Sequence, residues 1–257
     1  MSKRKLTKQF LEKLYKKYNR LNSADDPIWK ILQYKNELDQ ELLAFIATVY
    51  AFGNVKQINN SIAKIFDLFY PSALDKIYDL NFILHIEKSS PINHRFIFHY
   101  DFIALIKTLN IVYREFGSLK NLFLQNYNPL DSNLEKPIIT FSNNLRKIIQ
   151  SFNISSMQAK FLFPSPDNRS PCKRMNLFLR WMVRKDNIDF GLWPEIRTSQ
   201  LVVPVDTHIY RIARYYGLTK LKSPSWNMAV EITDSLKKFD PEDPVKYDFA
   251  LMHFRDF

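Results

Sequence analysis

The sequence predicts a mostly helical fold, and three observations support that prediction. Only 4 of the 257 residues are glycine, whereas β-barrels and sandwiches need glycine at tight turns and nucleotide-binding α/β folds need it in phosphate loops. Apolar residues recur at helical spacing along most of the chain. Residues that cap or break helices separate these apolar runs. We therefore expect an all-α protein.

The elements follow one another with short breaks. A first helix is expected at 4–19, and a helix that is buried nearly all round at 42–50. Further helices are predicted at 55–69, after Pro71, from Phe102 to Gly117, and at 118–127, 137–152, 173–186, 207–217, 224–238 and 242–254. A turn-rich connector (163–171), an irregular insertion (186–200) and an extended segment (201–205) lie between them. We expect one domain over 1–257 with two lobes, 41–175 and 1–40 plus 176–257.

The charge balance favours a polyanionic partner. Thirty-seven Lys and Arg against 26 Asp and Glu give a net charge of +11. Such a charge attracts nucleic acid or an acidic membrane surface at long range, although a Lys-rich composition alone could also produce it. Hydrophobic residues make up 46% of the chain and charged residues 25%, which excludes wholesale disorder.

Several classes of site and location are excluded. The single cysteine, Cys172, rules out disulfides within the chain, a Cys-ligated zinc site and a four-Cys iron–sulfur cluster. The basic N-terminus has no apolar core and is not a secretory signal. No stretch reaches 18 apolar residues. We expect a cytoplasmic monomer without metal or cofactor and without a membrane partner.

A basic helix follows the proline-rich connector. At about 100° per residue, Lys173, Asn176, Arg180 and Arg184 share one narrow sector, and apolar residues occupy the opposite side. Lys173 lies in the first turn, where the helix dipole favours the neutral amine that a nucleophilic lysine needs. The alternative is a solvated basic face without chemistry.

Asp206 lies where the extended segment meets the next helix. Aspartate is a preferred N-cap, so capping alone would explain it. A capping carboxylate can also face a cleft while backbone N–H groups hold its charge. Two residues on, His208 is expected to contact phosphate or to fill a surface site rather than to act as a catalytic base.

Together these residues resemble a known superfamily. The segment PVDTHIYRI is similar to V-D-T-H-[IV]-x-R-[IV] of the helix-hairpin-helix DNA glycosylases of the endonuclease III type, and K-R-M-N at 173–176 stands where they have K-T-A-N. The 33 residues between Lys173 and Asp206, which include DFGLW, resemble the longer gap of archaeal 8-oxoguanine glycosylases. Over about residues 20–252, the chain also looks like an uncharacterised bacterial family, a domain of unknown function related to those glycosylases. The segments that carry this second resemblance are SPCKRMNLFLRWMVRKD, DFGLW, VDTH and DPVKYDFAL.

The resemblance implies a two-lobe glycosylase fold and a DNA repair function: excision of a damaged base, expected to be oxidised guanine, flipped out of duplex DNA. Lys173 would be the Schiff-base nucleophile, giving AP lyase activity, and Asp206 would stabilise positive charge on the sugar. The other implied or candidate contacts are Arg169, Arg174, Asn176 and Arg180 on DNA, Asn54 or Gln57 in the vacated base stack, and Trp181 and Trp193 on the flipped base. For Trp181, a plain packing role is an equally good interpretation.

The chain departs from the superfamily at the hairpin. The usual L-P-G-V-G glycines are absent between Pro164 and Pro171, and Asn168 is expected to take the left-handed conformation instead. The iron–sulfur cysteines are also absent. The rival interpretation is a non-catalytic DNA- or RNA-binding module that has kept the fold and needs neither Lys173 nor Asp206.

Overall fold

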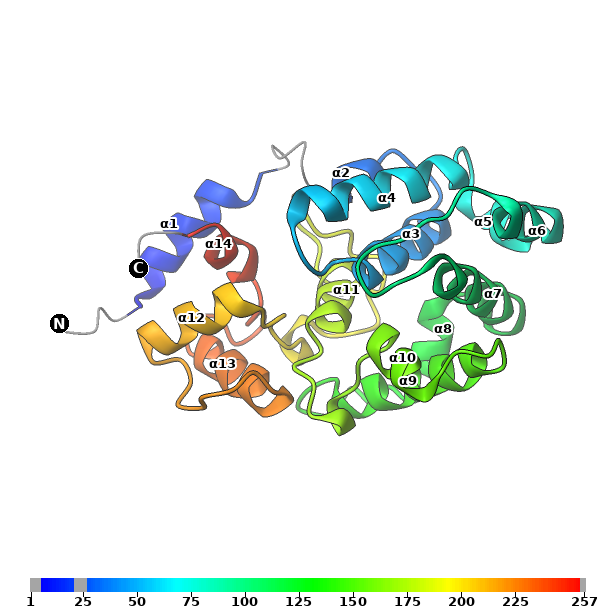
Figure 1. Ribbon diagram of the computed structural model, residues 1–257. Coiled ribbons are helices and arrows are strands. Elements are labelled where there is room, and N and C mark those ends of the chain that lie inside the picture. Colours follow the sequence, from blue (N-terminus) through cyan, green and yellow to red (C-terminus); the bar gives the residue numbers. More distant parts are fainter. Residues whose placement is uncertain (1–5, 21–26, 255–257) are drawn as a thin grey trace. The chain divides into compact units, whose positions relative to one another are not determined.

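The computed structural model describes residues 6–20 and 27–254. All regular secondary structure in these ranges is helical, so the predicted all-α class is confirmed (Figure 1). Two β-bridges, His94 with Ile97 and Lys185 with Phe190, are isolated pairs outside any strand. No helix in the described ranges has both the length and the apolar character that crossing a membrane requires.

The chain divides into two compact units. Unit 1 comprises Met1–Asn22, Tyr127–Ile139 and Pro164–Phe257, and unit 2 comprises Ser23–Asn126 and Thr140–Phe163. The net charge is divided unequally between the two units. Unit 1 carries 24 Lys and Arg against 15 Asp and Glu, whereas unit 2 carries 13 Lys and Arg against 11 Asp and Glu. The excess positive charge that suggested a polyanionic partner therefore belongs mainly to unit 1.

Unit 1 is built around its last helix. Its helices are α1 (Lys8–Tyr18), η1 (Pro166–Asn168), α11 (Lys173–Val183), η2 (Thr198–Gln200), α12 (Thr207–Tyr216), α13 (Trp226–Lys237) and α14 (Asp248–His253). The last of these, α14, packs against both α1 and α12. Phe10 meets Phe254 edge to face with ring centroids 5.4 Å apart, and Glu12 accepts hydrogen bonds from the Tyr247 hydroxyl at 2.7 Å and the Lys246 ammonium at 2.9 Å.

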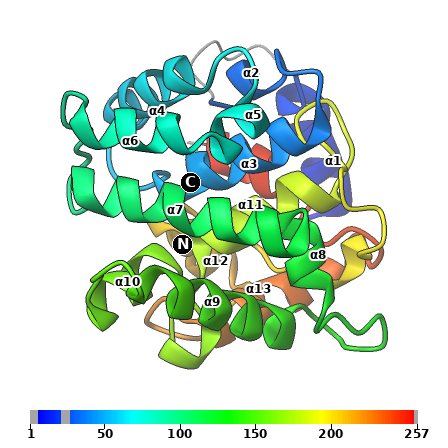
Figure 2. The same cartoon turned by 90° about the vertical axis from the view of Figure 1, so that its right-hand side faces the viewer.

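Unit 2 is built around a buried helix. Its helices are α2 (Pro27–Ile31), α3 (Glu37–Val49), α4 (Val55–Phe69), α5 (Ala73–Tyr78), α6 (Leu80–Lys88), α7 (His99–Phe116), α8 (Leu119–Leu124), most of α9 (Glu135–Gln150) and α10 (Ser156–Leu162). Residues 41–50 are all buried, which confirms the prediction for this stretch. Buried Glu41 accepts from Tyr113 at 2.9 Å and from the N–H of Leu119 at 2.8 Å, so its carboxylate stabilises the start of α8. Figure 2 shows α6 and α7 side by side.

The bounds of the two units differ from those of the predicted lobes. Residues 27–31 belong to unit 2 because α2 packs against α3 and α4. Residues 127–139 belong to unit 1, where Gln200 accepts from Tyr127 at 2.7 Å and donates to the carbonyl oxygens of Asn128 and Asp131. The connector and the start of α11 also belong to unit 1.

Candidate active site

Lys173 and Asp206 meet within unit 1. The Lys173 Nζ lies 3.4 Å from the Asp206 Oδ2, and 32% and 18% of the two side chains are exposed. The residues are 33 positions apart and lie at the starts of different helices, since Lys173 is the first residue of α11 and Asp206 is the N-cap of α12. The fold therefore gives this part of unit 1 a solvent-accessible amine beside a carboxylate.

The connector places Lys173 through two unusual backbone conformations. Arg169 ends η1 with φ 58°, and Cys172 precedes α11 with φ 51°, both in the left-handed region. Asn168 lies inside η1 instead, so the prediction that it takes this conformation is wrong. The Cys172 N–H donates to the Ser170 hydroxyl at 3.1 Å. These two reversals turn the chain so that α11 begins directly at the lysine.

Asp206 uses its two carboxylate oxygens differently. Oδ1 accepts from the backbone N–H groups of His208 at 2.9 Å and Ile209 at 2.8 Å, which confirms the predicted N-cap. Oδ2 faces the Lys173 ammonium. Just before it, the extended segment is held by a hydrogen bond from the Val203 N–H to the buried hydroxyl of Thr233 at 3.0 Å. The carboxylate thus caps α12 and still presents a charged oxygen to the neighbouring amine.

His208 ties α12 to the end of α14. Its Nε2 donates to the carbonyl oxygen of Phe254 at 2.8 Å, and the ring is half-buried. Since this N–H is already used within the chain, a phosphate contact would need another part of the residue. The phosphate contact of His208 stays a prediction.

The prediction that Arg180 contacts DNA is wrong. Only 3% of its side chain is exposed, its Nε lies 3.1 Å from Asp189 and its Nη1 lies 2.5 Å from Asp248. One turn on, Arg184 is also buried and pairs with Asp189, and with Asp186 and Asp243 at 3.0 Å each. The face that the sequence suggested to be basic is neutralised by acids from the insertion and from residues 243–248.

Asp248 connects this buried network to the Lys173–Asp206 pair. Its side chain is buried, Oδ2 is held by Arg180, and Oδ1 has no hydrogen-bond partner. Burial raises the pKa of the Asp248 carboxyl, and the positive charge of Arg180 lowers it. The negative charge of Asp206 also raises this pKa, whereas the positive charge of Lys173 lowers it. The charges of the candidate pair therefore act on a buried carboxylate that sequence reasoning had not singled out.

The remaining residues of the basic helix have different surroundings. Arg169 is exposed, and Arg174 is half-buried, with a pKa that burial lowers to about 10. Asn176 is buried and its Nδ2 donates to the carbonyl oxygen of Pro171 at 3.3 Å. The prediction for Asn176 is corrected accordingly, because this side chain supports the turn before α11. Phosphate contacts by Arg169 and Arg174 stay predictions.

Both tryptophans predicted to stack on a base are buried. Trp193 has no exposed surface and meets Phe178 of α11 edge to face, with ring centroids 5.2 Å apart. Trp181 is 3% exposed and packs against Phe190 in the same way. The insertion folds back on α11, since the Trp193 N–H donates to the carbonyl oxygen of Met182 at 2.8 Å. The prediction that these rings line a base pocket is wrong.

Trp193→Phe should lower the free energy of unfolding by roughly 1–3 kcal/mol, because the smaller ring leaves a void against Phe178. Urea denaturation measures this loss. Trp29→Phe is the control, since Trp29 is 47% exposed and should change stability little. An unchanged stability of the Trp193 variant would contradict the core assignment, because a base-stacking ring could be replaced by phenylalanine without loss.

Asn54 and Gln57 belong to unit 2, whereas Lys173 and Asp206 belong to unit 1. Both are exposed, and Asn54 is the N-cap of α4, with its Oδ1 accepting from the Lys56 N–H at 2.9 Å. The capping role explains Asn54 locally. Insertion of either side chain into a base stack stays a prediction.

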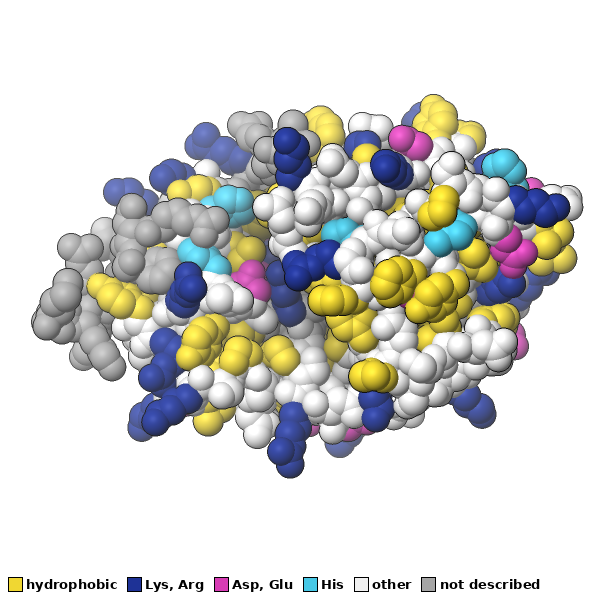
Figure 3. Space-filling view, in the orientation of Figure 1, with side chains coloured by type: hydrophobic (Ala, Val, Ile, Leu, Met, Phe, Trp, Pro, Cys, Tyr) yellow, Lys and Arg dark blue, Asp and Glu magenta, His cyan; other side chains and the backbone are white. Residues whose placement is uncertain are grey.

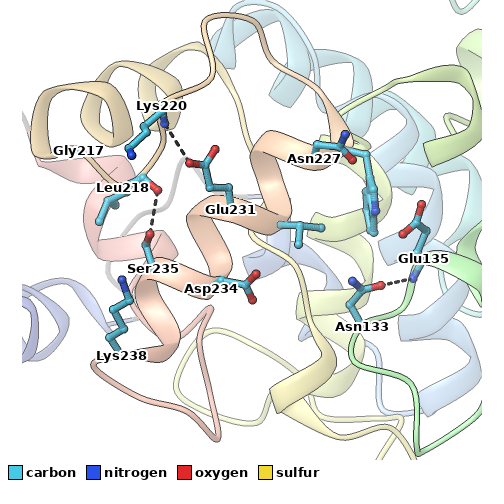
Figure 4. Close-up of a pocket in the computed structure, with 12 residues that line it drawn as sticks. Asn133, Glu135, Gly217, Leu218, Lys220, Asn227, Glu231, Asp234, Ser235 and Lys238 are labelled. Atoms are coloured by element: carbon cyan, nitrogen blue, oxygen red, sulfur yellow. Dashed lines mark hydrogen bonds between the residues drawn. The ribbon is translucent and has the colours of Figure 1, made fainter.

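A separate pocket of about 580 Å³ lies in unit 1 along α13, and its lining does not include Lys173 or Asp206 (Figure 4). Glu231 accepts there from the Thr219 hydroxyl at 2.7 Å and the Lys220 N–H at 3.1 Å, and Ser235 donates to the Leu218 carbonyl oxygen at 2.9 Å. These polar groups are satisfied within the chain. The pocket is therefore a feature separate from the amine–carboxylate pair.

A family model described as a protein of unknown function, DUF2400, matches residues 26–255. The chain belongs to the DUF2400 family. The match extends over both units of this DUF2400 protein and includes Lys173, Asp206 and Asp248. No curated protein and no solved structure matches it. The description of the DUF2400 family names no activity, so a function has to be argued from the site.

Proposed function

We propose that this protein is a DNA glycosylase with AP lyase activity, which excises a damaged base, preferably an oxidised purine, from duplex DNA. The observation that supports the proposal best is the 3.4 Å separation of the Lys173 Nζ and the Asp206 Oδ2. A lysine beside a carboxylate fits chemistry in which an amine attacks a sugar carbon that becomes positively charged. The superfamily resemblance of the two segments supplies the substrate class.

The proposed reaction has a simple balance. Lys173 gives up a proton, and its nitrogen lone pair forms a bond to C1′ of the flipped nucleotide. The bond from C1′ to the base breaks, and the base leaves with the electron pair and takes up a proton. Asp206 Oδ2 stabilises the positive charge that develops on the sugar. The C1′–O4′ bond then breaks, O4′ takes up a proton from the amine nitrogen, and the bond from C1′ to nitrogen becomes the double bond of a Schiff base. Loss of a C2′ proton to water and departure of the 3′ phosphate with the electron pair of the C3′–O bond then nick the strand.

The surroundings of the pair suit these roles. The N–H groups of His208 and Ile209 hold Asp206 by Oδ1 and leave Oδ2 directed at the amine. Lys173 is a third exposed, so a substrate can reach it from solvent. The positive charge of unit 1 favours DNA as the partner. A non-catalytic binder would need the charge but not the pair.

Borohydride trapping tests the proposed function. The full-length protein is incubated with labelled duplexes that each contain one lesion, such as 8-oxoguanine, thymine glycol, uracil or an abasic site, and sodium borohydride is added. Reduction of a Schiff base should give a covalent protein–DNA product on denaturing gels with at least one duplex. No product with any duplex, the abasic one included, would contradict the lysine chemistry.

Duplex binding should weaken steeply with salt. If unit 1 neutralises phosphates, the logarithm of the affinity falls linearly with the logarithm of salt concentration, by about 0.9 per phosphate contact. Arg169→Ala should reduce this slope by about 0.9, the value of one phosphate contact, since Arg169 is exposed in the connector that precedes Lys173. Fluorescence anisotropy over a salt series measures it. A salt-independent affinity of the wild-type protein would remove DNA from the proposal.

A further inference from the structure

Unit 2 carries an exposed cluster of aromatic side chains around the start of α7. Phe96, Phe98 and Tyr100 are 58%, 47% and 59% exposed, and Met157 at the start of α10 is also exposed. Figure 3 shows hydrophobic side chains gathered on this face of unit 2. Contiguous apolar side chains left in solvent mark an interaction site. We call Arg95, Phe96, Phe98, Tyr100 and Met157 the aromatic surface.

The backbone holds these side chains in fixed positions. His94 and Ile97 exchange two hydrogen bonds of 2.8 and 2.9 Å, which places Arg95 and Phe96 at the tip of a tight turn. The Gln158 amide donates to the Phe96 carbonyl oxygen at 2.8 Å and so fixes this turn to α10. The Phe98 and Tyr100 rings lie nearly parallel, at 14°, with centroids 5.8 Å apart. Flat rings are therefore presented to solvent from an ordered backbone.

A cation lies among the rings. The Arg95 guanidinium is 6.0 Å from the Phe52 ring centroid and 5.5 Å from that of Phe96. Arg95 has φ 53°, which is unfavourable for a residue other than glycine. Gly53 has φ 102°, and a Cβ there would lie 2.6 Å from the Arg95 Nη1. The guanidinium therefore lies against two rings, and the absence of a Cβ at Gly53 leaves room for it.

The chemistry of the surface fits nucleic acid. The segments 51–66, 88–100 and 140–163 contain no Asp or Glu and include Lys56, Arg95 and Lys160. The nearest acid in the chain, Asp101, is buried and accepts a hydrogen bond from the Phe98 N–H at 2.8 Å. Exposed rings stack on bases, and an adjacent cation pairs with phosphate. We propose that the aromatic surface binds single-stranded nucleic acid by stacking unpaired bases on Phe96, Phe98 and Tyr100, with Arg95 on the backbone. This activity goes beyond base excision and uses neither Lys173 nor Asp206.

Anisotropy with a labelled single strand of about 12 thymidines tests the proposal, a length within the usual range of single-strand sites. The full-length protein with both Phe98→Leu and Tyr100→Leu keeps an apolar surface but loses two rings. It should bind at least about tenfold more weakly than the wild type. Leu84→Ala on α6, where Leu84 is 52% exposed outside the aromatic surface, should bind as the wild type does.

A second strand isolates the contribution of the bases. An abasic oligonucleotide of the same length has the same phosphates, so the wild type should bind it about as weakly as the double leucine variant binds thymidines. Equal wild-type affinity for both strands would overturn the proposal, because only charge would then be recognised. Undiminished binding by the leucine variant would also overturn it and would indicate a surface for an apolar protein partner. The double leucine variant should still give the borohydride-trapped product on a lesion duplex, because Phe98 and Tyr100 belong to unit 2 and not to the Lys173–Asp206 pair, and this result separates the proposal from the lyase chemistry.

Discussion

Asp206→Asn should lower the rate of base excision by about two to three orders of magnitude in a protein that remains folded. The asparagine amide oxygen can keep both hydrogen bonds from the N–H groups of His208 and Ile209, since both go to Oδ1. The amide nitrogen would replace Oδ2, which faces Lys173. A neutral amide cannot stabilise a positively charged sugar as a carboxylate does. Single-turnover excision assays measure the rate.

A second N-cap provides the control for Asp206→Asn. Asp79 caps α6 and accepts from the Asn81 N–H at 2.9 Å, so Asp79→Asn makes the same chemical change at a helix start in unit 2. Both variants should melt close to the wild type, and Asp79→Asn should retain excision. If Asp206→Asn excises at the wild-type rate, the charge-stabilising role of Asp206 is wrong.

Lys173→Gln belongs to the same test, because it removes the nucleophile and not the carboxylate. Borohydride trapping and strand nicking should be lost, while duplex binding should persist, since only one positive charge of unit 1 is removed. Lys185→Gln is the matched control, because Lys185 is an exposed lysine just beyond the same helix. Trapping by the Lys173 variant equal to that of the wild type would show that another amine forms the Schiff base.

Local signals allowed much of the helical framework to be predicted from the sequence. Gly117 and Gly217 end α7 and α12 in the left-handed conformation, with φ 76° and 73°, as expected of glycine at that position. Asp206 caps α12, as its position between the extended segment and the next helix indicated. Helix ends and N-caps depend on a few residues that are neighbours in the chain, so they can be predicted from the sequence alone.

The predictions that were wrong depend on partners distant in the chain. Arg180 seemed to be a surface cation because the helical pattern shows only its own helix, whereas its partner Asp248 lies 68 positions away. Trp193 was expected to stack on the flipped base, but its backbone returns to α11 and its ring is buried. Helix α14 begins at Asp248 rather than at 242, because Asp243 pairs with Arg184 and turns occupy the intervening residues. Only the tertiary structure shows these pairings.

We expect the largest loss of stability when the buried ion pair between Arg180 and Asp248 is broken. Arg180 joins α11, which carries Lys173, to Asp248 of α14 and to Asp189 of the insertion. Through His208, α14 is in turn linked to α12, which follows Asp206. The helices that position both members of the candidate pair therefore depend on one buried guanidinium.

Arg180→Met should lower the free energy of unfolding by about 3–5 kcal/mol, because it leaves the buried Asp248 carboxylate without its counter-charge. Combining it with Asp248→Leu should recover part of that loss, since the apolar pair removes the unpaired carboxylate at position 248 while Asp189 keeps its ion pair with Arg184. Urea denaturation measures both, and exposed Arg169→Met is the control, expected within about 0.5 kcal/mol of the wild type. A cost below about 1 kcal/mol for Arg180→Met, or no recovery in the double variant, would show that the pair does not hold α11 to α14.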